Sequence, residues 1–248
     1  MLDFSSKWRY EKEKNLYFSE GEEPQTQRQL FYEQYFNFIK KYVPMHPDMS
    51  VLDLGCGRGT MGQFFRGRAG IEDVTFLDES IEAIALAKDN FGLSGKFIVG
   101  SALELPFQDE TFDIVVSMGV SEHVENYPKF FYEQMRVLKK GGYLICMTVP
   151  HKRSIQMLNI LSRDHYHRDE HNTTDDYVKF LKQTTDYEVA EIWLNPFPLF
   201  TPVPRWIDYV ISHMYRDILW IRKLFKADPF SGSKALSQSH FIITRRSS

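Results

Sequence analysis

The sequence is 248 residues long, enough for one α/β domain with a sizeable core, and its 43% hydrophobic and 25% charged residues argue against a disordered chain. A net charge of −3 gives no electrostatic reason to expect nucleic-acid binding. The two cysteines, Cys56 and Cys146, fit no disulfide or metal spacing. Since neither a signal peptide nor an apolar run of membrane-spanning length is recognisable, we expect a cytoplasmic protein without a transmembrane segment.

Helix and strand patterns alternate through most of the chain. The apolar and aromatic residues between Gln25 and Tyr42 recur at helical spacing and predict an amphipathic helix that ends before Pro44. Expected strands are Val51–Gly55, Val74–Asp78, Lys96–Gly100, Phe112–Gly119, Tyr143–Pro150 and Tyr187–Asn195. Expected helices are Thr60–Arg68, Ser80–Asn90, Pro128–Lys139 and Thr174–Thr184. This alternation predicts a mostly parallel sheet with helices on both faces.

The alternation stops after residue 195. Prolines between Pro196 and Pro204 indicate a stiff loop, and apolar residues from Ile207 to Phe225 recur at helical spacing. Because Arg205–Lys226 combines an apolar stripe with basic residues, we interpret it as a lid helix or a dimer contact, with an interfacial membrane helix as the alternative. Ser239–Thr244 is expected to form the last strand.

The segment Val51–Gly59 is a short buried strand followed at once by a glycine-rich turn, a pattern typical of a ligand site at the carboxyl edge of a sheet. Its Gly-x-Gly-x-Gly spacing differs from the dinucleotide fingerprint Gly-x-Gly-x-x-Gly. Asp53, before the first glycine, suits a cationic or amine-bearing ligand, or braces the turn. Asp78, at the end of the second strand, suits two ribose hydroxyls, or caps the next helix.

Three further motifs follow in order, namely Gly100–Phe107, Asp109–Ser117 and Arg136–Leu144. With these motifs, the region from Met49 to Pro150 resembles the class I S-adenosylmethionine-dependent methyltransferases, and most closely the small-molecule branch that includes the ubiquinone and menaquinone biosynthesis enzymes. The resemblance implies an α/β fold: a Rossmann-like, doubly wound sheet of seven strands, mostly parallel, whose last strand is antiparallel. We also expect an N-terminal helical cap and an insertion before the last strand.

We expect one methyltransferase domain over residues 1–248. Its parts are a helical cap (1–48), a cofactor-binding core (49–150), an acceptor-side region (151–238) that includes an insertion (197–238), and the last strand with the tail (239–248).

The resemblance also implies which residues hold S-adenosylmethionine. Asp53, Gly55 and Gly57 would line its methionine half, and Asp78 would hold the ribose with Glu79 beside it. Ser101 stands where the family often has an aspartate that contacts the adenine amino group, and a hydroxyl is a weaker, neutral partner. The other residues expected at the cofactor are Cys56, Ala102, Leu103, Met118 and Gly119.

His123, which follows the fourth strand, is the candidate general base, because a neutral imidazole suits proton removal near neutral pH. Alternatively His123 only braces its loop. Residues expected near the acceptor are Tyr17, His151, His165 and His167. The segment from His165 to His171 holds three histidines and two acids, but their spacing matches no metal-binding pattern, so we expect no metal there.

These features predict methyl transfer from S-adenosylmethionine to oxygen, nitrogen or carbon of a small organic acceptor, with release of S-adenosylhomocysteine. Two alternatives stay open: an NAD(P)-dependent oxidoreductase, and a non-catalytic binding protein with a methyltransferase-like fold. We expect a monomer or a homodimer, no nucleic-acid partner, and peripheral membrane contact only through residues 205–226.

Overall fold

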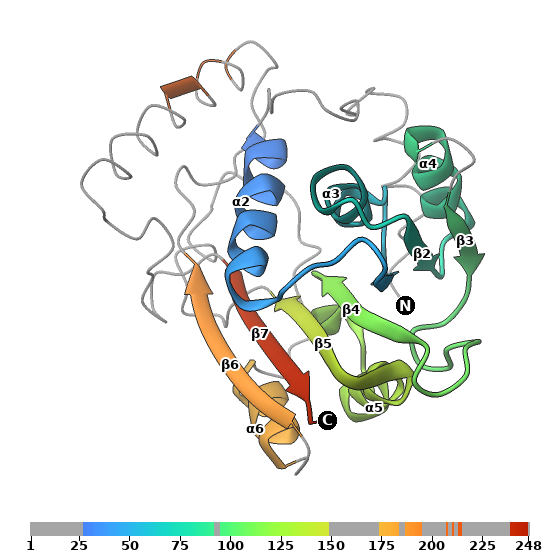
Figure 1. Ribbon diagram of the computed structural model, residues 1–248, viewed down its shortest axis with the longest axis vertical. Helices are drawn as coiled ribbons and strands as arrows, with labels where there is room; N and C mark the ends of the chain where they lie inside the picture. The colour runs from blue at the N-terminus through green and yellow to red at the C-terminus, as the bar shows by residue number, and fades with distance from the viewer. Residues whose placement is uncertain are drawn as a thin grey trace.

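The computed structural model describes residues 27–91, 95–148, 174–183, 187–194 and 239–247, together with residues 207, 210, 213 and 214. Figure 1 shows a central sheet with helices on either side of it. The strands are β1 (Ser50–Leu54), β2 (Asp73–Asp78), β3 (Lys96–Val99), β4 (Phe112–Met118), β5 (Leu138–Thr148), β6 (Tyr187–Leu194) and β7 (Ser239–Arg246). The helices are α2 (Gln27–Tyr42), α3 (Thr60–Ala69), α4 (Ile81–Phe91), α5 (Tyr127–Val137) and α6 (Thr174–Gln183), with a single 3₁₀ turn, η2, at Ser121–His123.

The strands form one seven-stranded sheet in the order β3-β2-β1-β4-β5-β7-β6. Strands β1 to β5 pair in parallel, and β7 pairs antiparallel with both β5 and β6. The mostly parallel sheet with an antiparallel last strand is therefore confirmed. The chain leaves β1 toward β2 on one side and returns to β4 on the other, so the topological switch point lies between β1 and β4. In open α/β sheets, ligands bind at that point, outside the carboxyl ends of the strands.

Alternate strand residues point to opposite faces, and each face carries its own buried core. Val51 and Val116 belong to the core beneath α2, α3 and α4, whereas Leu52 and Val115 belong to the core beneath α5 and α6. Both faces of the central strands are therefore apolar, as expected for parallel strands covered on two sides. Burial of these side chains, each contributing roughly 1.5–3 kcal/mol, dominates the stability of the fold.

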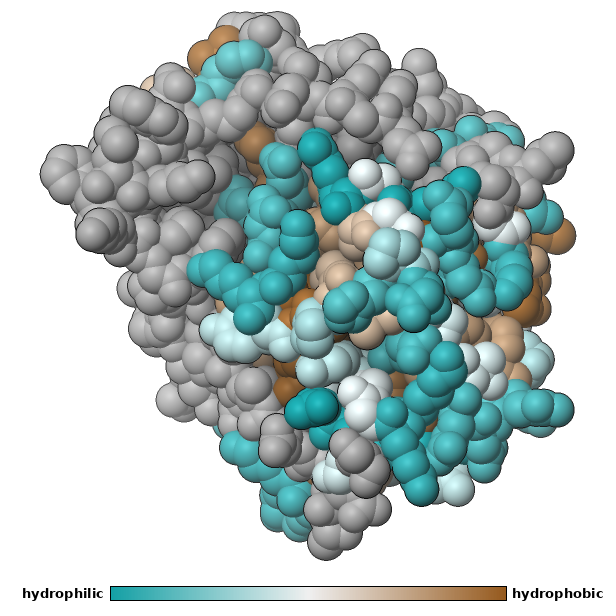
Figure 2. All heavy atoms as spheres, viewed as in Figure 1, coloured by the Kyte–Doolittle hydropathy of each residue, from teal (hydrophilic) through white to brown (hydrophobic). Residues whose placement is uncertain are grey.

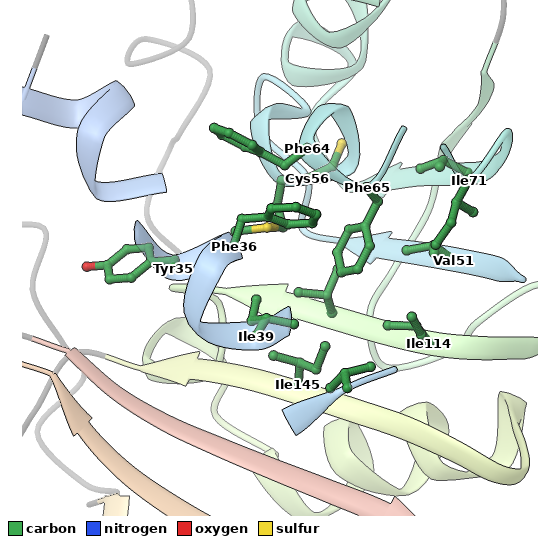
Figure 3. Packing of buried hydrophobic residues seen from close by; sticks show 14 of the residues in the cluster. Tyr35, Phe36, Ile39, Val51, Cys56, Phe64, Phe65, Ile71, Ile114 and Ile145 are labelled. Carbon is green, nitrogen blue, oxygen red and sulfur yellow. The ribbon is translucent and has the colours of Figure 1, made fainter. Parts of the chain in front are cut away.

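Aromatic side chains fix helix α2 to the rest of the core. Phe36 stacks on Phe64 and meets Phe65 edge-on, with both pairs of ring centroids 5.5 Å apart. Phe38 and Tyr35 contact Phe241 of β7. Figure 3 shows the Phe36, Phe64 and Phe65 rings above the sheet. The predicted N-terminal helix is therefore confirmed from Gln27, and its aromatic residues Tyr35, Phe36 and Phe38 attach it to the core.

One predicted boundary was wrong. The helix expected over Pro128–Lys139 ends at Val137, and β5 begins at Leu138, before the glycine pair that was expected to follow the helix. The reason is a bulge: Phe112 pairs with Leu138, but Ile114 already pairs with Tyr143. Gly141, with φ of 75°, lies in the extra residues of β5 and permits this irregularity.

Several predicted features lie outside the described residues: the acceptor-side residues Tyr17, His151, His165 and His167, and most of the helix expected between Ile207 and Phe225. Among the residues that are described, no helix is both long and apolar enough to cross a bilayer. Hydrophilic side chains make up most of the described surface in the view of Figure 2.

Close packing of α3 on β2 depends on Gly62. A Cβ on this residue would lie 2.2 Å from Cε1 of the buried Phe76 ring and 3.1 Å from the Asp53 carboxyl. Phe76 stacks in turn on Phe97 of β3, with ring centroids 4.9 Å apart, so the ring has little freedom to move away.

Replacing Gly62 with alanine is expected to lower the free energy of unfolding by about 1–3 kcal/mol, because overpacking displaces the Phe76 ring and α3. Urea unfolding followed by circular dichroism measures the change. Gly67→Ala in the exposed part of the same helix is the matched control, and it is expected to leave stability unchanged or raise it. Equal stability of the two variants would contradict this packing account.

Candidate functional site

The glycine turn follows β1 directly at the carboxyl edge of the sheet. Gly55, Gly57 and Gly59 all have positive φ, between 56° and 74°, a conformation that residues with a Cβ rarely adopt. The Gly55 and Cys56 amides both donate to the Leu77 carbonyl of β2, at 2.8 and 3.1 Å. A Cβ on Gly55 would lie 2.4 Å from Cγ2 of Val120, so the turn also approaches the loop after β4 closely. The turn thus lies at the switch point, between the ends of β1, β2 and β4.

Asp78 connects this turn to the end of β2. Its Oδ2 accepts the Gly57 amide at 2.9 Å, and its Oδ1 accepts the Ser80 amide at 2.9 Å. The residue is 8% exposed. Asp78 therefore binds the backbone just before α4, and its expected contact with a ribose stays a prediction.

Asp53 is the second acid at the turn, and its carboxylate binds the first turn of α3. Its Oδ2 accepts the Gly62 amide at 2.8 Å, so a strand residue satisfies one of the first free N–H groups of α3, whose own N-cap is Gly59. Burial raises the pKa of Asp53 to about 7, and the nearby Asp78 charge adds to the increase. Asp53 therefore braces the turn from below, and its protonation state is poised near neutral pH.

The loop after β3 forms the next wall of the site. The Gly100 amide donates to the Asp78 carbonyl at 3.0 Å, which places the start of this loop beside the acid. Ser101 is exposed, and its Oγ accepts the Leu103 amide at 3.1 Å. Ala102 and Leu103 are partly buried. Ser101 thus presents a hydroxyl, and its neighbours an apolar surface, next to Asp78.

The segment after β4 carries His123 on η2. The Gly119 amide donates to the Met147 carbonyl at 2.8 Å, and the His123 amide donates to Val120 at 2.9 Å. Below the turn, the buried Tyr177 hydroxyl of α6 donates to the Ser121 carbonyl at 2.9 Å. The turn that holds His123 is therefore fixed to both β5 and α6.

Sequence reasoning did not anticipate the polar groups under this turn. Glu122 is buried, and its Oε2 accepts from the hydroxyls of Ser121 and Thr148, each at 3.4 Å. Cys146 donates weakly to the Ser121 hydroxyl at 3.7 Å. Glu122 can be noticed in the sequence as the neighbour of His123. The hydrogen bonds from Thr148 to Glu122 and from Tyr177 to Ser121 join distant segments, so no local pattern predicts them.

The remaining predicted cofactor residues differ in how they meet the site. The Cys56 side chain belongs to the hydrophobic core that includes residues of α2 and α3, its thiol donates weakly to the Gly57 carbonyl at 3.7 Å, and burial raises the pKa of this thiol (Figure 3). Glu79 is exposed, and Met118 and Gly119 are partly buried at the end of β4. Asp113 lies at the other edge of the sheet, where it binds Ser50 and Lys139 near the beginnings of β1, β4 and β5.

These residues fit a nucleoside with a charged tail. A buried carboxylate ends β2, the loop that carries Ser101 begins next to this residue, and the glycine turn binds the carboxylate through the Gly57 amide. A pyrophosphate would fit poorly, because two acids, Asp53 and Asp78, lie at the turn. Within the described part of the chain, no group of three or more potential metal ligands occurs.

Comparison with known proteins agrees with this geometry. Residues 52–146 match the family model described as a methyltransferase domain. The ubiquinone biosynthesis O-methyltransferase of Rickettsia bellii is 27% identical over 161 residues, which cover 62% of this chain and 66% of that protein. The probable tocopherol O-methyltransferase of Oryza sativa is 33% identical over 171 residues, which cover 62% of this chain and 47% of that protein.

The fold has solved counterparts as well. A SAM-dependent methyltransferase from Archaeoglobus fulgidus superposes with a TM-score of 0.57 at 17% identity, covering 87% of this chain and 94% of that one. The chain spans less than two thirds of the length of the curated relatives above. The family model, the relatives and the fold agree on the same region: residues 52–146 are similar to a methyltransferase domain, and the fold is the one found in solved methyltransferases.

Proposed function

We propose that this protein transfers the methyl group of S-adenosylmethionine to a small organic acceptor and releases S-adenosylhomocysteine. The observation that carries the proposal is Asp78, whose carboxylate joins the glycine turn to the end of β2 and whose main-chain carbonyl binds Gly100 at the start of the next loop. This arrangement suits a ribose between a methionine chain and an adenine. The related proteins are, by their names, O-methyltransferases of ubiquinone biosynthesis and of tocopherol, so a hydroxyl on a ring-bearing molecule is the first acceptor class to test.

Each wall of the site has a distinct task in this proposal. Asp78 accepts the two ribose hydroxyls, Gly55 and Gly57 allow the methionine chain to approach the backbone, and Ser101 with Ala102 and Leu103 holds the adenine. S-adenosylmethionine supplies a methyl group already activated on a sulfonium, so no metal is needed for activation. The protein has to align the acceptor with that methyl and exclude water.

His123 is the candidate for removing a proton from the acceptor. Its turn follows β4 at the same edge as the glycine turn, and Val120, three residues earlier, packs against Gly55. A partly buried imidazole on a fixed turn suits proton removal from a hydroxyl or an ammonium as the methyl transfers. Residues 151–238 complete the acceptor side in this proposal, and the protein acts in the cytoplasm as a monomer or homodimer.

Ligand titration tests the proposed cofactor. Isothermal calorimetry is expected to show binding of S-adenosylmethionine and S-adenosylhomocysteine, and none of NAD. Asp78→Ala is expected to weaken both adenosyl ligands by about tenfold or more, because a hydrogen bond to a charged group contributes about 1.5–3 kcal/mol. Asp73→Ala, at the exposed start of the same strand, is the matched control and should bind normally.

Two results would count against these assignments. Binding of NAD without either adenosyl ligand would overturn the proposed function. Undiminished binding by folded Asp78→Ala would remove only the role given to Asp78, and thermal unfolding of both variants establishes that they are folded.

Asp53 is expected to make cofactor binding depend on pH. Its pKa of about 7 means that it is largely protonated below neutrality, whereas a bound cationic ligand favours the ionised form. Binding then releases a proton, so affinity for S-adenosylmethionine rises by up to about tenfold from pH 6 to pH 8. Asp53→Asn keeps an acceptor for the Gly62 amide and should lose this part of the rise. Identical pH profiles of the two proteins would contradict the link.

Replacing His123 with alanine is expected to lower turnover about 10²–10⁴-fold while leaving the affinity for S-adenosylhomocysteine within about threefold, because a general base acts only in the transition state. Single-turnover rates with an acceptor that the wild type methylates, and calorimetric titration, measure the two quantities. His46→Ala, at an exposed position before β1, serves as the control. Unchanged turnover would leave His123 with a bracing role alone.

A further inference from the structure

A network of hydrogen bonds between α5 and the loop that follows β3 holds this loop in place, outside the surfaces described above. We call it the Arg136 network; it consists of Arg136 and Glu133 of α5 and the loop residues Leu105, Phe107 and Asp109. Arg136 Nη2 donates to the Leu105 carbonyl at 3.0 Å, and Nη1 donates to the Phe107 carbonyl at 2.7 Å and to Asp109 Oδ1 at 2.9 Å.

Glu133 completes this network. It receives Arg136 Nε at 3.0 Å and Nη2 at 2.8 Å, and its Oε2 also accepts the Leu105 amide at 2.8 Å. All five N–H groups of the guanidinium therefore have acceptors, three of them on the loop. A lysine has one nitrogen and three donors, so it cannot reproduce this fork.

The Glu133–Arg136 part of the network is largely sheltered from water, whereas Asp109 is exposed. The Glu133 and Arg136 side chains are 11% and 20% exposed, and Leu105 is buried against α5. Hydrogen bonds from Arg136 hold the pKa of Glu133 below its usual value. Phe107 packs edge-on against Phe112 of β4, with ring centroids 4.9 Å apart, and strengthens the same attachment. Residues 105–109 thus have one fixed position relative to α5.

The fixed part of the loop begins two residues after the surface proposed for adenine. Leu103 is tied to Ser101 through its amide, Glu104 to the Ser101 carbonyl, and Leu105 to Glu133. At its other end the loop is held by Gly100, whose amide donates to Asp78. Residues 101–104 therefore span a short distance between two anchors, Asp78 at the ribose end and the Arg136 network at the far end.

We propose that Glu133 and Arg136 are positioning residues that set how selectively the site binds the adenine base, although neither belongs to the Ser101–Leu103 surface proposed for adenine. The proposal rests on the proposed function, and it adds that base selectivity is controlled from α5 through the backbone of the loop. When the hydrogen bonds from the Arg136 guanidinium to the loop are lost, the loop no longer holds Ser101, Ala102 and Leu103 in one arrangement. The site then distinguishes poorly between purines.

The test compares the affinities of two ligands that differ only in the base: S-adenosylhomocysteine, and S-inosylhomocysteine, in which an oxo group replaces the adenine amino group. Calorimetry gives both dissociation constants for the wild type, Arg136→Lys and Glu133→Gln. The wild type is expected to prefer the adenine ligand by about tenfold or more, since a site built to bond a polar group rejects an analogue that lacks it. Arg136→Lys is expected to reduce that ratio to about two or less.

The matched control disturbs a neighbouring ion pair that does not contact the loop after β3. Lys139 binds Asp113 at 2.8 Å near the beginnings of β4 and β5, and Lys139→Met removes that contact. The control is expected to lose stability in thermal unfolding but to keep the wild-type base ratio. A change in the ratio therefore separates positioning of the base from a general loss of stability.

The outcomes separate the inference from the function on which it rests. If the wild type binds neither ligand, the proposed function fails, and this inference fails with it. If the wild type binds both ligands with similar affinity, only the role of Glu133 and Arg136 is overturned. The same holds if folded Arg136→Lys keeps the wild-type ratio of the two dissociation constants. If Arg136→Lys does not fold, Glu133→Gln decides, because it keeps an acceptor for the Leu105 amide while removing the charge that pairs with Arg136.

Discussion

The carboxylate of Asp78 is the interaction on which the candidate site depends. The carboxylate accepts hydrogen bonds from the Gly57 amide of the glycine turn and from the Ser80 amide just before α4. The main-chain carbonyl of Asp78 accepts a third hydrogen bond, from the Gly100 amide of the loop after β3. Three loops that follow three different strands therefore meet at one residue. Hydrogen bonds from amides to a buried carboxylate are stronger than neutral ones, so the loops keep their arrangement before any ligand arrives.

A second acid makes this arrangement electrostatically costly. Asp53 is buried 25 positions earlier in the chain, beneath the same turn, and its charge and that of Asp78 oppose each other. Burial and the Asp78 charge raise the pKa of Asp53 to about 7, and the Gly62 amide donates to its carboxylate, which lowers this cost. A cation bound at the turn relieves the same repulsion. The two acids thus favour a ligand with positive charge, which distinguishes the site from one that binds a pyrophosphate.

Much of the fold could be predicted from the sequence because its strands are continuous apolar runs with glycine or aspartate at their ends. The boundary of β5 could not, since Leu138–Lys140 continues the helical pattern of α5 and only pairing with Phe112 makes it a strand. The glycine turn and Asp78 were predictable because neighbouring residues define them. Contacts between distant segments, such as Asp53 with Gly62, Tyr177 with Ser121 and Arg136 with Phe107, leave no local pattern.

A crystal structure of the protein with S-adenosylhomocysteine tests the central claim most directly. The account predicts that both ribose hydroxyls lie within hydrogen-bond distance of the Asp78 carboxylate, with the homocysteine chain over Gly55 and Gly57 and the base against Ala102 and Leu103. The amides of Gly57 and Ser80 should keep Asp78 as their acceptor. A ligand bound elsewhere, or a ribose that does not contact Asp78, would contradict the account.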